Sequence, residues 1–282
     1  MLNLKSIKQK FYQDLKSIFS NQEISSIWNQ WVVKEILAMS LVEYFSREKF
    51  RLKTTDLAKI NSLTSHLLQN KPIQYFFGYT YFKGLKIGIN SHVLIPRPET
   101  EELVDLVLLH AKKMNLDRIV DVGVGSGCIA IALKKEIKAQ VLGIDCCDNV
   151  LSVASQNAMQ NSVNIDLMLI NVLEKEEHNV VPMMDIIVSN PPYVLASEVP
   201  KDSNIIHEPS IAIFVDKKNP LIFYRSILKL ANKKLNVGGK IFFEINPNLV
   251  QELLILIESL GYSDIEIHRD FYDKKRFIVV SS

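Results

Sequence analysis

The stretch Asp121-Val122-Gly123-Val124-Gly125-Ser126-Gly127 joins the end of an apolar run to the start of a helical pattern, and this junction indicates the class of fold. The preceding run, residues 118–122, is typical of a buried strand, and a helix is expected from Ser126 onward. Three glycines in five positions let the backbone approach a ligand closely and leave helix N-terminal amides pointing toward it. Packing in a tight turn accounts well for one or two glycines, but poorly for three.

The spacing of these glycines differs from that of a dinucleotide site. The pattern G-x-G-x-x-G would place glycine at position 128, where this chain has Cys128, so the loop is G-x-G-x-G. This departure favours a nucleoside ligand other than NAD. The next predicted strand, residues 140–144, is followed by Asp145, and an acidic side chain there can accept both ribose hydroxyls of a nucleoside. Asp121, at the carboxyl end of its own strand, belongs to the same predicted cofactor site.

Strands and helices alternate from this loop to the C-terminus. Helices are expected after Pro98, from Ser126, over 149–161, from Pro220 and over 247–260, and strands over 118–122, 140–144, 165–170, 185–188 and 240–244 and near Ile265 and Phe277. This order predicts an α/β fold with a doubly wound, mostly parallel sheet of seven strands.

Residues before this region follow a different periodicity. Between Leu4 and Leu68 apolar residues recur at helical spacing, which predicts a small bundle of three or four helices that ends at Asn70-Lys71-Pro72. Strand-like alternation is expected over 73–95, with a hairpin around Lys83-Gly84. The predicted domains are a helical domain (1–71), a hairpin connector (72–97) and an α/β domain (98–282).

Composition excludes several classes of protein. The chain has 282 residues, 48% hydrophobic and 23% charged, which excludes a wholly disordered or fibrous protein. A net charge of +2 argues against binding polyanions through bulk charge. Residues 1–71 nevertheless hold 11 Lys/Arg against 6 Asp/Glu, which fits either contact with an anionic partner or a solvated helical face.

The cysteines and the N-terminus indicate an intracellular protein without metal. Cys128, Cys146 and Cys147 have neither disulfide-framework nor zinc-site spacing, so no metal is expected. The charges from Lys5 to Lys16 do not fit a signal peptide, and no apolar run is long enough for a bilayer span. We therefore expect a cytoplasmic protein without membrane contact, and a monomer by default.

The string Ser189-Asn190-Pro191-Pro192-Tyr193 follows the fourth predicted strand of the sheet. The prolines lack N–H groups, so the backbone presents carbonyl oxygens, and Asn190 adds an amide oxygen. Tyr193 adds a flat apolar face. Such a site suits a planar NH2 group, whose hydrogens would go to Asn190 and the Pro191 carbonyl. A simple turn explains Asn-Pro-Pro, but not its place at the ligand-binding edge of the sheet.

Together these motifs resemble S-adenosylmethionine-dependent methyltransferases that act on planar nitrogen. Two further strings, Ile95-Pro96-Arg97-Pro98-Glu99-Thr100-Glu101 and Pro72-Ile73-Gln74-Tyr75 with Gly78, are similar to the release factor glutamine N5-methyltransferase family, also called PrmC or HemK. The resemblance extends from about Pro72 to the end of the chain. It implies a Rossmann-like methyltransferase that modifies the glutamine of the Gly-Gly-Gln motif in peptide chain release factors. In this interpretation residues 1–71 are the substrate-docking domain and residues 98–282 the S-adenosylmethionine-dependent methyltransferase domain.

The resemblance also implies roles for individual residues. Asn171 stands where the family usually has an acid that accepts a hydrogen bond from the adenine amino group. The amide oxygen of Asn171 can accept the same hydrogen bond. The S-adenosylmethionine site would comprise Asp121, Gly123, Val124, Gly125, Ser126, Gly127, Asp145, Asn171, Val172 and Asn190. The glutamine would be held by Asn190, Pro191, Pro192 and Tyr193, with Asn190, Pro191 and Tyr193 catalytic. Arg97 and Glu99 are substrate-binding by resemblance alone, and an interdomain ion pair explains them equally well.

Three other functions are open at this point. A nucleic-acid adenine or cytosine methyltransferase shares the Asn-Pro-Pro-Tyr string, but the low net charge and the lack of a target-recognition insert argue against DNA binding. A non-catalytic binding module would not need Asn190 to Tyr193. An oxidoreductase is disfavoured by Cys128 in the glycine loop.

Overall fold

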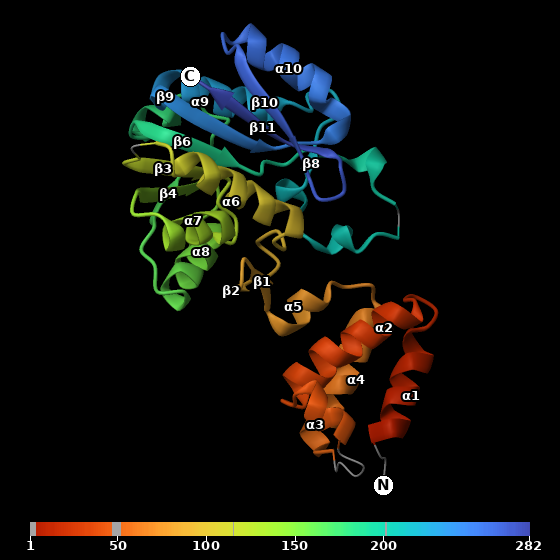
Figure 1. Cartoon of the computed structure of the whole chain (residues 1–282). Coiled ribbons are helices and arrows are strands. Elements are labelled where there is room, and N and C mark those ends of the chain that lie inside the picture. Colours follow the sequence, from red (N-terminus) through yellow and green to blue (C-terminus); the bar gives the residue numbers. More distant parts are fainter. Residues whose placement is uncertain (1–3, 47–51, 115, 201) are drawn as a thin grey trace. The chain divides into compact units, whose positions relative to one another are not determined.

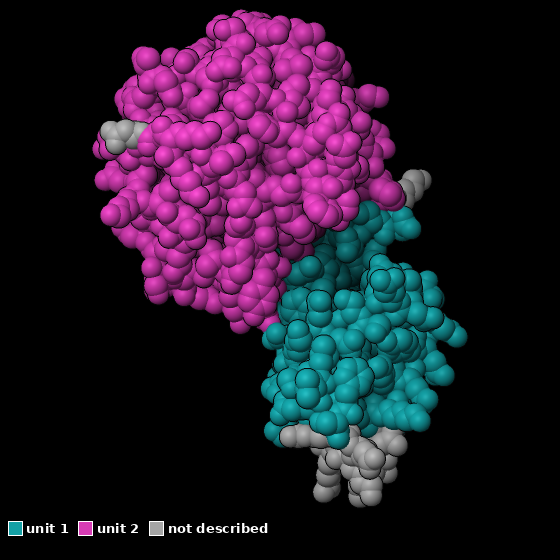
Figure 2. Space-filling model, in the orientation of Figure 1, with its two compact units in different colours: residues 1–77, 202–207 teal, residues 78–201, 208–282 magenta. Residues whose placement is uncertain are grey.

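The computed structural model of the chain describes residues 4–46, 52–114, 116–200 and 202–282. They form two compact units, one of residues 1–77 with 202–207 and one of residues 78–201 with 208–282, coloured separately in Figure 2. The short segment 202–207 belongs to the first unit, where Asn70 Nδ2 donates to the carbonyl oxygen of Asp202 at 2.6 Å. Residues 47–51, which fall within the predicted helical bundle, lie outside the described residues.

The first unit is helical, as its apolar periodicity predicts. Phe11, Trp28 and Leu63 are fully buried in its core, with the Phe11 and Trp28 rings in edge contact at 5.3 Å. Its helices are α1 (Leu4–Leu15), α2 (Asn21–Ile27), the π-helix η1 (Trp28–Ile36), α3 (Leu41–Ser46), α4 (Thr54–Leu68), α5 (Ile73–Phe77) and the 3-10 turn η4 (Asn204–His207).

Helix α5 corrects one sequence-based expectation. The sequence pattern predicts strand-like structure from residue 73, and this prediction is wrong for Ile73–Phe77, which is helical. The reason is packing, because the Phe77 ring stacks on Trp31 of η1 with centroids 4.5 Å apart. Five residues are too few to distinguish the two periodicities, so tertiary contact decides the structure.

The second unit is built on a seven-stranded sheet, which confirms the predicted fold class (Figure 1). Its order is β10-β11-β9-β6-β3-β4-β5 and only β11 runs antiparallel to its neighbours. The strands are β3 (Arg118–Val122), β4 (Gln140–Asp145), β5 (Asp166–Leu169), β6 (Met184–Ser189), β9 (Leu235–Glu244), β10 (Asp264–Arg269) and β11 (Lys275–Ser281).

Helices cover both faces of this sheet (Figure 1). One face packs on α9 (Ile222–Lys234) and α10 (Val250–Ser259), whose apolar side chains share a core with Val120 and Val122 of β3. Residues alternate along a strand, so Asp121 points to the other face. That face carries α6 (Pro98–Ala111), α7 (Cys128–Glu136) and α8 (Asp148–Gln160). Helix α7 starts two residues later than expected, because Gly127 takes a left-handed φ of 83°.

Shorter elements complete the second unit. The expected hairpin is present as β1 (Tyr79–Phe82) and β2 (Leu85–Gly88), joined by Lys83 and Gly84 at positive φ. Elements too short to give a sequence pattern are η2 (Glu177–Val180), β7 (Val194–Leu195), η3 (Ala196–Glu198), η5 (Ser210–Ala212), β8 (Phe214–Val215) and η6 (Pro247–Leu249). In the part of the chain that the structure describes, no helix has both the length and the apolar character of a membrane span.

Candidate functional site

The candidate site lies at the carboxyl ends of three neighbouring parallel strands. In the sheet, β3 lies between β4 and β6, with Asp121 opposite Gly143 on one side and Val188 on the other. The glycine loop, Asp145 and the Asn190 string follow these three strands, so the fold brings all three motifs to one edge. Ser189 strengthens the junction, since its hydroxyl donates to the Val122 carbonyl at 2.6 Å.

The glycine loop has a shape that only glycine adopts readily. Gly123, Gly125 and Gly127 have φ values of 76°, 55° and 83°. At Gly127 an added Cβ would also lie 3.2 Å from the Cβ of Ala154 on α8. Buried Asn157 stabilises the loop, because its amide nitrogen donates to the carbonyl oxygens of Ser126 and Gly88, each at 2.8 Å. Asn157 has no role in the sequence-based site, although it braces the loop.

Asp121 is fully buried beneath this loop. Its Oδ2 accepts the backbone N–H of Ala130 at 3.1 Å, whereas Oδ1 has no hydrogen-bond partner among the described residues. Burial raises the pKa of Asp121 to about 7, and Asp145 adds to the rise. A buried carboxylate with an unpartnered oxygen suits a ligand that carries positive charge or donor groups.

Asp145 is part of the same loop geometry. Its Oδ2 accepts the backbone N–H of Gly125 at 3.1 Å, so it fixes the loop's middle glycine. Burial raises the pKa of Asp145, and the amides of Gly125, Cys146 and Cys147 oppose that rise. The carboxylate remains partly exposed at the strand end.

Asn171 and Val172 lie beside Asp145, because the Ile170 amide donates to the Asp145 carbonyl at 2.8 Å. The Asn171 side-chain oxygen accepts the Leu173 N–H at 3.1 Å, and such an oxygen has a second lone pair. The Asn171 backbone N–H donates to Glu177 at 2.6 Å. Glu177 therefore brings an acidic group next to the position where an acid was expected.

A chain of hydrogen bonds runs from Asn190 into the protein interior. Asn190 Nδ2 donates to Thr100 Oγ1 at 3.0 Å, and the Thr100 hydroxyl donates to Glu244 Oε2 at 2.7 Å. Tyr193 donates its hydroxyl to the other oxygen of Glu244 at 2.8 Å. Thr100 and Glu244 are buried, with only 2% and 1% of their surface exposed. The chain therefore joins α6, the Asn190 string and the end of β9.

These hydrogen bonds determine which way the Asn190 amide faces. A threonine hydroxyl has one hydrogen, and here Glu244 accepts it. The Thr100 oxygen can then only accept, so the NH2 group of Asn190 must face it. The Asn190 carbonyl oxygen consequently points away from Thr100 and is available to accept N–H groups from a ligand.

The sequence pattern does not single out Glu244, and it includes Thr100 only as one member of the string from Ile95 to Glu101. Burial raises the pKa of Glu244, and the Thr100 and Tyr193 hydroxyls and Arg276 oppose the rise. Burial and the Glu244 charge together raise the pKa of Tyr193, so its phenol stays protonated. A signal did exist, since Glu244 is an acid at the end of an apolar strand, where ligands of such sheets bind.

Arg97 pairs with a residue that the sequence reasoning did not assign to it. Arg97 Nη2 lies 2.5 Å from Glu208 Oε1, and the Ile95 N–H donates to Glu208 Oε2 at 3.0 Å. Both residues lie in the second unit, so this pair joins two motifs of one unit. Glu99 lies in the first turn of α6. Pro191 is buried and Pro192 partly buried between Asn190 and Tyr193.

Comparisons with known proteins place the chain among methyltransferases. A family model described as "Methyltransferase small domain" matches residues 103–210. The release factor glutamine methyltransferase of Flavobacterium psychrophilum is 37% identical over 286 residues, which cover 99% of each chain. That of Bacteroides thetaiotaomicron is 33% identical over 274 residues, or 95% of this chain and 96% of that protein.

Among solved structures, the Thermus thermophilus 16S rRNA N2 G1207 methyltransferase, in complex with AdoMet and guanosine, has the same fold. It superposes with a TM-score of 0.52 at 17% identity, over 72% of this chain and 49% of that one.

The buried Asp121 carboxyl predicts a pH-dependent stability. Its pKa is about 7 when folded and about 4 when unfolded, so between these values the folded state binds more protons. The free energy of unfolding therefore falls as pH rises from about 4 to about 7. Asp121→Asn removes this loss, and urea unfolding of the cofactor-free protein at several pH values measures the difference.

The exposed Asp166→Asn is the matched control for loss of one carboxylate. A constant difference in unfolding free energy between wild type and Asp121→Asn across this pH range contradicts the prediction.

Proposed function

Since the chain belongs to the release factor glutamine methyltransferase family, we propose that it methylates N5 of the glutamine in the Gly-Gly-Gln motif of peptide chain release factors. The methyl donor is S-adenosylmethionine. The observation that carries the proposal is the Asn190 amide, whose NH2 group donates to Thr100 and whose carbonyl oxygen is therefore left to accept N–H groups of the substrate.

The cofactor residues fit S-adenosylmethionine. The glycine loop from Gly123 to Gly127, with Val124 and Ser126, leaves backbone room for a nucleoside, and Asp145 offers a partly exposed carboxylate for ribose hydroxyls. The unpartnered Oδ1 of buried Asp121 suits the cationic donor, and Asn171 and Val172 flank the adenine end. When bound, this cofactor supplies an activated methyl group on a positively charged sulfur.

The chain's own residues must mainly orient the acceptor. An amide nitrogen is a weak nucleophile, because its lone pair is delocalised into the carbonyl. Asn190 Oδ1 and the Pro191 carbonyl oxygen each accept a hydrogen bond from one N–H of this amide. Together they orient the nitrogen toward the methyl group. The same two oxygens would stabilise the positive charge that develops on nitrogen as it takes the methyl group from the sulfur of the donor.

Proton loss then completes the reaction. One N–H proton leaves for solvent after transfer, so a strong base beside Asn190 is unnecessary. Tyr193 packs against the amide plane and keeps water from it, with its hydroxyl fixed on Glu244. Pro192 keeps the backbone free of competing N–H donors.

We assign docking of the release factor to the helical unit. Residues 1–71 carry 11 Lys/Arg against 6 Asp/Glu, an excess that suits an acidic partner surface. Arg97, held by Glu208, and Glu99 are assigned to the entrance for the glutamine.

Methyl-labelled S-adenosylmethionine tests the acceptor directly. The full chain is incubated with a release factor, with the same factor carrying Ala in place of the Gly-Gly-Gln glutamine, and with duplex DNA. We expect label on the intact factor alone. Label on DNA, or on the Ala-substituted factor at the same level, contradicts the proposal.

Two substitutions separate acceptor binding from cofactor binding. Asn190→Ala should lower kcat about 100-fold with little change in cofactor Kd, because the lost contact acts on the reacting nitrogen. Asp145→Ala should raise the cofactor Kd about tenfold or more. Calorimetric titration and steady-state kinetics measure both effects, and an equal loss of cofactor affinity in Asn190→Ala shows that its role is wrongly assigned.

A further inference from the structure

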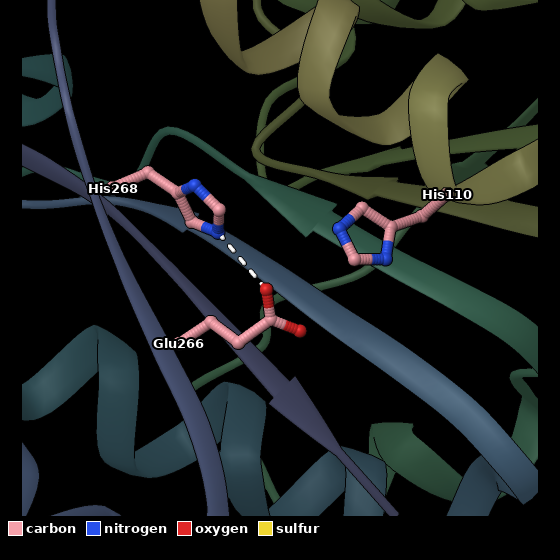
Figure 3. A group of neighbouring side chains, drawn as sticks. All are labelled: His110, Glu266 and His268. Atoms are coloured by element: carbon pink, nitrogen blue, oxygen red, sulfur yellow. Dashed lines mark ion pairs between the residues drawn. The ribbon is translucent and has the colours of Figure 1, made fainter.

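A cluster of two histidines and a glutamate lies away from the candidate site, at the far end of α6. His110 belongs to the last turn of α6, and Glu266 and His268 lie two residues apart on the same face of edge strand β10. Figure 3 shows the three side chains directed toward one another. By the rise of a helix, His110 is about 15 Å along α6 from Thr100.

The spacing of these side chains fits metal ligation. One ligand atom from each residue lies within 4.8 Å of the other two. His268 Nε2 and Glu266 Oε2 are 3.3 Å apart, close to the roughly 3.3–3.5 Å between two ligands of a tetrahedral zinc ion. Two imidazoles and one carboxylate are a donor set of zinc and related divalent ions.

One ligand atom of the cluster also lacks a hydrogen-bond partner among the described residues. His268 Nε2 is buried and has no hydrogen bond among the described residues, although Glu266 lies near. His110 is partly buried, which lowers its pKa and favours the neutral imidazole that binds metal. Lys240, Lys113 and His268 lower that pKa further, and Glu266 raises it.

Lys240 is the charged neighbour that opposes a cation here. Its Nζ lies 4.0 Å from Glu266 Oε1 and donates to Ser281 Oγ at 2.6 Å. The lysine therefore faces one carboxylate oxygen, while the other faces His268. Removing the lysine charge should strengthen metal binding without removing a ligand.

We propose that His110, Glu266 and His268 bind a zinc ion whose remaining position is filled by water. The ion joins the last turn of α6 to the edge strand β10. Because the first turn of the same helix carries Thr100, the site stabilises the helix on which Asn190 depends. This inference does not rest on the proposed methyl acceptor.

Elemental analysis of the untagged full chain tests the site. The protein is stripped with a chelator, dialysed against micromolar zinc and measured for bound metal and for Tm. We expect about one zinc per chain and a higher Tm with zinc. His268→Gln and His110→Gln should lose both effects, while His92→Gln, at an exposed histidine of the same unit, should keep them.

Two further variants distinguish this site from other zinc ligands. Cys146→Ser with Cys147→Ser should leave zinc binding unchanged, and Lys240→Met should lower the zinc Kd severalfold. Co2+ in place of zinc gives a visible absorption band that reports ligation in the wild type, independently of whether a variant folds. Absence of bound zinc and of this band in the wild type, or unchanged binding in folded His268→Gln, overturns the proposal.

Discussion

The Glu244 carboxylate is the group on which the candidate site depends. It is buried at the end of β9, where a charge is stable only if hydrogen bonds satisfy it, and it accepts one from Thr100 and one from Tyr193. Because the Thr100 proton is committed to Glu244, Thr100 can only accept from Asn190. A single buried acid thus sets the direction of the amide that we propose holds the substrate, and it also fixes Tyr193.

The parallel sheet brings the other parts of the candidate site together. Parallel strands β3, β4 and β6 end at one edge, so the glycine loop, Asp145 and Asn190 lie together although they are far apart in the chain. Helix α6 lies on one face of the sheet, and Thr100 near its start and His110 near its end both contact β9, through Glu244 and Phe242. Residues remote from the chemistry can therefore influence it through the position of this helix.

The sequence was sufficient for features that depend on local pattern. Alternating strands and helices predicted the seven-stranded sheet, and the glycines predicted a loop that the structure builds with three left-handed residues. Contacts between residues far apart in the chain could not be predicted from the sequence. Thr100 meets Glu244 across 144 positions and Arg97 meets Glu208 across 111, and only the packing of helix and loops on the sheet decides such partners. Helix α5 shows the same limit, since aromatic stacking overrides a short ambiguous pattern.

A double-mutant cycle on Thr100→Val and Glu244→Gln tests whether the hydrogen bonds from Glu244 through Thr100 orient the Asn190 amide. The kcat for methyl transfer to the release factor and the cofactor Kd are measured for the two single variants and the double variant, with unfolding followed in parallel. If Glu244 acts through Thr100, each single change lowers kcat by roughly tenfold, the double variant loses no more than the worse single, and the cofactor Kd is unchanged. Losses that multiply in the double variant, or a kcat that neither change affects, contradict this orientation of Asn190.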